Sequence, residues 1–190
     1  MIQEGISMQF KQYKRYHVDF KSKWIQPCAM LMGLSFFLRV FYYFGFCFVS
    51  DWSFWDVIFQ ILLPLVFAGV FTMTLWTLHR DLPGFYGLIG AGFCILIAIW
   101  SIYTGNLLYI LLCIVYYIAA GAVLLATSVG LLPGKLLSTV MLAIPVVIRI
   151  FTVKPFSLGL SGLCLEFSVI TLLGSLACFT CSLGETNKRK

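Results

Sequence analysis

Residues 107–127 read LLYILLCIVYYIAAGAVLLAT, a stretch of apolar and small residues without a single charge. A helix needs about 20 such residues to cross the ~30 Å hydrocarbon core of a bilayer. Similar blocks lie along the rest of the chain, so that 61% of the 190 residues are hydrophobic and only 11% are charged. An average soluble domain has about 25% charged residues. The composition therefore predicts an all-α integral membrane protein.

The apolar blocks are separated by short groups of turn-forming residues, and together they predict a compact bundle of about six transmembrane helices over residues 28–182. The predicted spans are 28–50, 57–78, 85–103, 107–127, 136–151 and 163–182. Pro64 and Pro145 fall inside the second and fifth spans, where proline removes a backbone hydrogen-bond donor. We expect neighbouring helices to cover these defects.

The segment before the bundle, residues 1–27, is basic and carries aromatic residues at spacings of three or four, namely Phe10, Tyr13, His17, Phe20 and Trp24. This spacing predicts an amphipathic helix that lies on the anionic cytoplasmic leaflet and ends at Pro27. A disordered basic tail is the alternative. Residues 183–190, which end in Lys188, Arg189 and Lys190, are predicted to form a second cytoplasmic basic tail.

The distribution of Lys and Arg predicts the orientation of the bundle. With the N-terminus inside, the cytoplasmic segments hold the N-terminal and C-terminal clusters, Arg80 and Lys135, whereas the outer segments hold Lys154 and, at a span end, Arg149. Lys and Arg are retained on the cytoplasmic side. We therefore expect both termini in the cytoplasm and the bundle in the plasma membrane.

Several function classes have no support in the sequence. The two histidines, His17 and His79, belong to no metal-binding or catalytic motif, so neither an enzyme nor a cofactor is predicted. The seven cysteines are scattered, and nearly all of them lie inside apolar stretches. Even Cys178 and Cys181, which are three residues apart, are therefore predicted to be packing residues rather than metal ligands. The basic residues flank the spans and do not form a nucleic-acid-binding surface.

Three ionisable residues fall inside the predicted spans: Arg39, Arg149 and Glu166. A charge at the centre of a membrane helix costs about 2.5–3.5 kcal/mol on insertion scales, which makes each a candidate functional residue. Arg149 and Glu166 lie toward the outer ends of the fifth and sixth spans, where an ion pair that neutralises both is one interpretation and a shared ligand site is the other. Arg39 lies near mid-membrane without an evident partner in its own span, so a surplus positive charge could serve an anionic ligand or snorkel toward a headgroup.

The outer half of the first span is densely aromatic. Tyr42 and Tyr43 are candidates to hydrogen-bond a ligand in an outward-facing pocket, and lipid contact is the alternative for the whole group. Pairs of small residues four apart, such as Ala29/Gly33, Gly87/Ala91 and Ala122/Ala126, predict close helix packing within the bundle.

Two functions fit these features. The first is a component that binds or transports a small anionic or amphipathic solute at a site made by Arg39, Tyr42, Tyr43, Arg149 and Glu166. The second is a non-transporting membrane subunit or scaffold whose buried charges pair internally or with helices of other membrane subunits. The first predicts that Arg39 and Glu166 face one outward-open cavity, and the second predicts internal pairing or a lateral surface.

Overall fold

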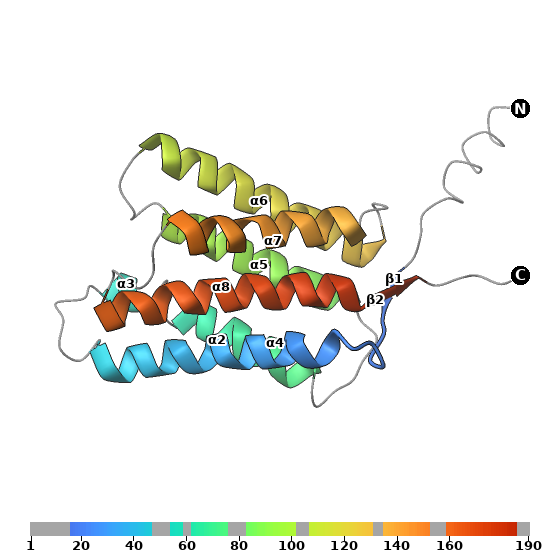
Figure 1. Ribbon diagram of the computed structural model, residues 1–190, viewed down its shortest axis with the longest axis horizontal. Helices are drawn as coiled ribbons and strands as arrows, with labels where there is room; N and C mark the ends of the chain where they lie inside the picture. Colours follow the sequence, from blue (N-terminus) through green and yellow to red (C-terminus); the bar gives the residue numbers. More distant parts are fainter. Residues whose placement is uncertain are drawn as a thin grey trace, which may run out of the picture.

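The computed structural model describes residues 16–46, 54–58, 62–75, 83–101, 107–130, 135–152 and 159–185. These residues form six long helices, a short helix and two short strands (Figure 1). The elements are β1 (Tyr16–Val18), α2 (Ile25–Phe46), α3 (Phe54–Val57), α4 (Leu63–Met73), α5 (Pro83–Ser101), α6 (Leu107–Val129), α7 (Lys135–Thr152), α8 (Gly159–Ser182) and β2 (Leu183–Glu185). Each predicted span overlaps one of the long helices, and the overlap is smallest for span 57–78, because α4 covers only Leu63–Met73 and Val57 belongs to α3.

The six long helices pack as a closed ring in which every helix touches two neighbours. The order around the ring is α2, α8, α7, α6, α5, α4 and back to α2. The first and last long helices are therefore adjacent, and Figure 1 shows the ribbons of α2 and α8 side by side. This closure gives α8 contacts with both α2 and α7 along the length of the bundle.

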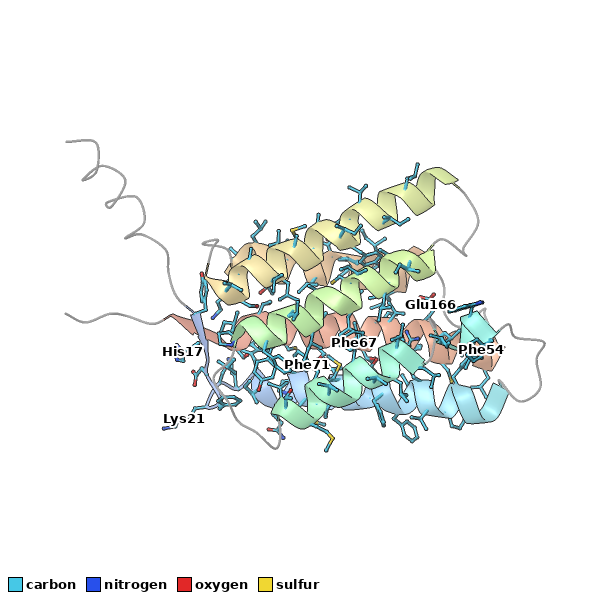
Figure 2. All side chains as sticks on the ribbon, turned by 180° about the vertical axis from the view of Figure 1, so that it is seen from behind. His17, Lys21, Phe54, Phe67, Phe71 and Glu166 are labelled. Atoms are coloured by element: carbon cyan, nitrogen blue, oxygen red, sulfur yellow. The ribbon has the colours of Figure 1, made fainter. Side chains whose placement is uncertain are left out.

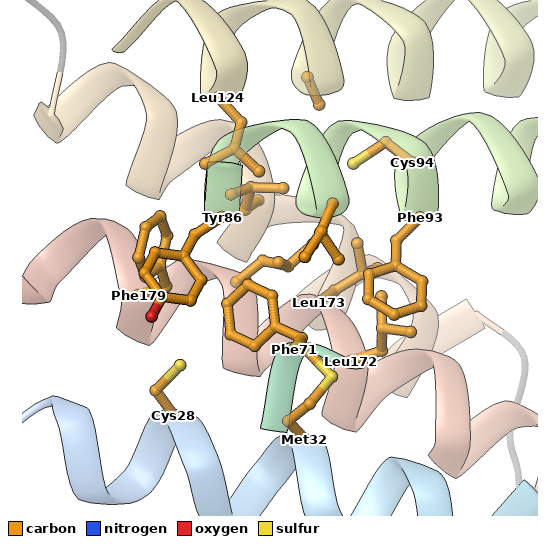
Figure 3. Close-up of a cluster of buried hydrophobic side chains, with 14 of the residues drawn as sticks. Cys28, Met32, Phe71, Tyr86, Phe93, Cys94, Leu124, Leu172, Leu173 and Phe179 are labelled. Carbon is orange, nitrogen blue, oxygen red and sulfur yellow. The ribbon is translucent and has the colours of Figure 1, made fainter. Parts of the chain in front are cut away.

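Aromatic side chains fill the space enclosed by the six helices. Phe71 on α4, Tyr86 on α5 and Phe179 on α8 form a triangle whose ring centroids are 5.6 to 5.7 Å apart. Such separations suit edge-to-face aromatic packing. Met32 from α2 and Leu124 from α6 are fully buried in the same cluster (Figure 3). Leu142 from α7 belongs to it as well, so all six long helices contribute to one core.

Pro145 leaves a gap in the hydrogen bonding of α7, and a neighbouring helix fills it. Proline lacks the N–H that would bond the carbonyl four residues earlier, which belongs to Met141. The hydroxyl of Tyr116 on α6 donates a hydrogen bond to that Met141 carbonyl. This is the compensation expected from the sequence. Pro64 is different, because it lies in the first turn of α4, where proline is tolerated.

Glycines bring α5 and α6 into close contact. A Cβ at Gly87 would lie 2.5 Å from the Cβ of Ser128, and a Cβ at Gly121 would lie 3.3 Å from the backbone of Ala91. The predicted packing role of Gly87 and Ala91 is therefore confirmed. Ala122 is exposed, so it does not contribute to this contact.

The prediction of a helix up to Pro27 is wrong for the described part of the first segment. Residues Tyr16–Val18 form strand β1, which pairs antiparallel with β2, and turns follow up to α2. Residues 1–15 lie outside the described residues. The tail predicted from residue 183 is likewise a strand at its start. Pairing of the two segments satisfies their backbone groups and overrides the local spacing of aromatics. Pro27 lies in the first turn of α2, where proline is tolerated.

Two described helices are long and apolar enough to cross a membrane, over Ile25–Tyr42 and Gly162–Ser182. Four shorter apolar stretches lie on the other long helices, at Leu63–Met73, Pro83–Ile99, Ile114–Val129 and Lys135–Ile148. Length and composition alone do not separate a membrane span from the core helix of a soluble protein, so this finding gives weak support for membrane association.

Candidate functional site

The contact between α2 and α8 is built on hydrogen bonds from serine side chains. The Ser175 hydroxyl donates to the Cys28 carbonyl over 2.8 Å, and the Ser35 hydroxyl donates to the Ser168 carbonyl over 2.8 Å. Two turns along α2 thus correspond to two turns back along α8, which fixes the antiparallel register of the helices. We call this line of contact the α2–α8 seam.

One turn beyond Ser35, the seam brings together two of the predicted charged residues. Arg39 on α2 is buried, with 4% of its surface exposed. Glu166 on α8 is half-buried, and its carboxylate attracts the Arg39 guanidinium electrostatically. Figure 2 places Glu166 at the end of the bundle that carries Phe54, opposite to His17 and Lys21. The partner of Arg39 that was missing from its own span therefore lies on the last long helix.

The electrostatics of this pair follow from its burial. A guanidinium removed from water loses a large hydration free energy, which only an opposite charge and good hydrogen bonding can offset. Glu166 supplies the opposite charge. The Glu166 side chain itself keeps some exposure. The arrangement neutralises the positive charge that the sequence left uncompensated.

The other predicted site residues are placed only in part. Tyr42 is buried, with 6% exposure, one turn after Arg39 on α2. The side chains of Tyr43 and Arg149 lie outside the described residues, although both positions belong to helices, α2 and α7. The expected pairing of Arg149 with Glu166 therefore stays a prediction. The structure brings Arg39 and Glu166 together across the α2–α8 seam, and Tyr42 follows Arg39 by one turn on α2.

Sequence reasoning missed the serines of the seam. Ser35, Ser168 and Ser175 are buried and bridge α2 and α8. A signal was present in the sequence, since serines two turns apart interrupt otherwise apolar helix faces at 168 and 175. Ser, Thr and Cys side chains in membrane helices hydrogen-bond across helix contacts, so such spacing indicates a helix partner.

The cysteines of the described chain are free thiols, and Cys178 and Cys181 are half-buried on α8. The Cys181 sulfur lies 3.8 Å from the Thr139 hydroxyl of α7, so it takes part in helix packing. Among the residues that the structure describes, no group of three His, Cys, Asp or Glu side chains could hold a metal ion.

The sequence matches no family model, no curated protein and no solved structure. A functional proposal therefore depends on the geometry of the structure, above all on the α2–α8 seam.

Proposed function

We propose that the chain is a multi-pass membrane protein that serves as a non-transporting, membrane-embedded subunit or scaffold. Its exposed surface supports the membrane part of the proposal. Large apolar side chains are more than half exposed on all the long helices, among them Phe37, Val66, Leu88, Val115, Leu136, Phe151 and Leu160. Soluble monomers rarely expose contiguous apolar patches of more than a few hundred Å². A surface of this kind on every side of a helical ring suits lipid tails.

The length of the bundle supports the same conclusion. Helix α2 has 22 residues, which corresponds to about 33 Å at 1.5 Å per residue and is close to the ~30 Å thickness of the hydrocarbon core. Trp24, 41% exposed, precedes this helix, and Trp55, 61% exposed, lies on α3 at the opposite end (Figure 1). Aromatic residues concentrate at the two membrane–water boundaries.

The burial of Arg39 within electrostatic reach of Glu166 is the observation that favours a subunit or scaffold over a transporter. A solute site requires both charges to face one accessible cavity, whereas Arg39 is buried on the α2–α8 seam and is attracted by Glu166. Attraction between a buried cation on the first long helix and a half-buried carboxylate on the last fits a role in holding the bundle together.

A small-solute binding or transport component is the second candidate. The partial exposure of Glu166 favours it, because this ionisable residue is not fully buried and its charge reaches the buried Arg39. Ionisable groups inside membrane proteins often mark the path of a solute or ion.

The first experiment tests the membrane topology. The chain should remain in the membrane fraction after alkaline carbonate washing. Reporter fusions after residues 105, 134 and 190 should place the first outside and the other two in the cytoplasm, as six spans with both termini inside require. Recovery of the chain in the soluble fraction, or a reporter at 134 on the same side as the reporter at 105, would contradict the proposal.

The second experiment separates the two functions. Purified protein is heated with panels of vitamins, amino acids and anionic metabolites, in parallel with Arg39→Met and Glu166→Gln variants. A solute present at 100 times its dissociation constant adds about 2.7 kcal/mol to the stability of the protein, which shifts the melting temperature measurably. The scaffold proposal predicts no solute-dependent shift. A shift that disappears in either variant would favour the second candidate.

A further inference from the structure

The turn that joins β1 to α2 presents positive charge and an aromatic ring at one end of the bundle. We call residues 20–24 the headgroup turn. Lys21 and Lys23 are exposed, Trp24 is 41% exposed, and the Lys23 ammonium lies 5.9 Å from the centroid of the Trp24 ring. The three side chains therefore form one outward surface that combines cations with an amphipathic ring.

Hydrogen bonds hold this turn in a defined shape. The Lys21 amide donates to the Asp19 carboxylate over 3.0 Å, and the Ser22 amide donates to the Asp19 carbonyl over 2.9 Å. The Ile25 amide then donates to the Ser22 carbonyl over 3.1 Å as α2 begins. The two lysines are thus carried by an ordered backbone rather than by a loose tail.

The strands fasten the headgroup turn to the end of the bundle. The Asp19 amide donates to the Ser182 carbonyl over 3.2 Å, next to the β1–β2 pairing. On the neighbouring helix, the Lys135 ammonium donates to the Leu183 carbonyl over 2.6 Å. A Cβ at Gly184 would lie 2.6 Å from the His17 ring, so the pairing is close. These contacts fix the position of the headgroup turn along the bundle axis relative to α2, α7 and α8.

The described charges are distributed unequally between the two ends of the bundle. Figure 2 shows Lys21 at the end with the strands, and Glu166 with Phe54 at the other end. Lys23 belongs to the same turn as Lys21, and Asp19 is the acidic residue beside them. Lys135 also lies at the strand end, where it binds β2. A leaflet of anionic lipid attracts Lys and Arg near its surface, and a Trp ring is stable at the same depth.

We infer that the headgroup turn binds the headgroups of anionic phospholipids in the leaflet on its side of the membrane. The inference rests on the proposed placement of the chain in a bilayer. The lysine ammonium groups donate hydrogen bonds to phosphate oxygens, and the Trp24 ring packs between the headgroups and the first carbons of the acyl chains. Each lysine near an anionic surface strengthens binding about fivefold, so the pair contributes roughly 30-fold.

The test measures lipid binding to the full chain in detergent by native mass spectrometry. Short-chain phosphatidylglycerol, short-chain phosphatidylcholine and free glycerol phosphate are titrated separately. The wild type is compared with Lys21→Gln/Lys23→Gln and with the charge-preserving control Lys21→Arg/Lys23→Arg. We expect the wild type and the Arg control to prefer phosphatidylglycerol, and the Gln variant to lose that preference by roughly 30-fold. If the double Gln variant fails to fold, each single Gln variant should lose about fivefold.

Three results would overturn the inference: equal binding of the two lipids by the wild type, an unchanged preference in the Gln variant, or binding of glycerol phosphate as tight as that of phosphatidylglycerol. The last result would assign the turn to a soluble phosphate instead of a lipid. Failure of the membrane proposal has a separate signature, because the chain would then dissolve in buffer without detergent, whatever lipid it binds.

Discussion

Removing one charge of the Arg39–Glu166 pair should destabilise the protein by an amount set by the burial of the charge that remains. Glu166→Gln leaves the guanidinium of Arg39 at 4% exposure without its attracting carboxylate. Breaking a buried pair in this way costs about 3–5 kcal/mol. Arg39→Met leaves the half-buried Glu166, whose partial exposure reduces the cost to about 1–2 kcal/mol.

The double variant Arg39→Met/Glu166→Gln should be far more stable than the sum of the single effects predicts. With both charges gone, neither side chain carries an uncompensated charge, and replacement of a buried ion pair by neutral groups is often close to neutral. We expect the double variant within about 1 kcal/mol of the wild type, so the coupling free energy, which is the sum of the two single losses less the loss in the double variant, should be at least about 3 kcal/mol.

Unfolding by sodium dodecyl sulfate in mixed micelles, followed by circular dichroism, gives the four stabilities of this cycle. Lys21→Met is the matched control, because it also removes a cation but from an exposed turn, and it should change stability by no more than about 0.5 kcal/mol. Single effects that simply add, with a coupling below about 0.5 kcal/mol, would refute the argument that the two charges stabilise each other.

Two further predictions concern helix packing. Tyr116→Phe removes the hydroxyl that bonds the Met141 carbonyl, so the stability measured in the same unfolding assay should fall by about 1–3 kcal/mol. An unchanged stability would show that the carbonyl finds another donor. Gly87→Ala places a Cβ 2.5 Å from the Cβ of Ser128, and we expect a loss of about 1–3 kcal/mol. Its control is Gly33→Ala, since a Cβ there meets nothing within 4 Å; equal losses in the two variants would contradict the packing argument.

The approximate positions of the helices could be predicted from the sequence because each helix is a largely apolar block with at most one charge in its interior. The strands at Tyr16–Val18 and Leu183–Glu185 could not. Three residues are too few to show the alternation of a strand, and the pairing joins segments from opposite ends of the chain. In the first segment, aromatic spacing that fits one face of a helix also occurs in a strand followed by turns, so local periodicity gave the wrong element.

The sequence singles out Arg39 and Glu166 as candidate residues, but it does not show that they lie close to each other. Arg39 and Glu166 were chosen because each is a charge in an apolar helix, which is visible in the sequence. For Glu166 the sequence suggests Arg149 as a neighbour, because the fifth and sixth spans are consecutive and a short connection favours contact, and this pairing stays a prediction. The ring also brings the first long helix beside the last, and this closure depends on the packing of all six helices rather than on any local pattern.

The polar contacts of α8 indicate why charges are tolerated at this seam. Lipid tails are as apolar as leucine, so membrane helices associate through close packing and hydrogen bonds rather than through the hydrophobic effect. Helix α8 provides these bonds on two sides: Ser175 bonds α2, and Thr180 lies 2.6 Å from the Thr139 hydroxyl of α7. The Arg39–Glu166 pair continues the same seam toward the other end of the bundle. A charge pair aligned with structural hydrogen bonds, on the contact that closes the ring, favours a role in assembly of the bundle over a role in moving a solute through it.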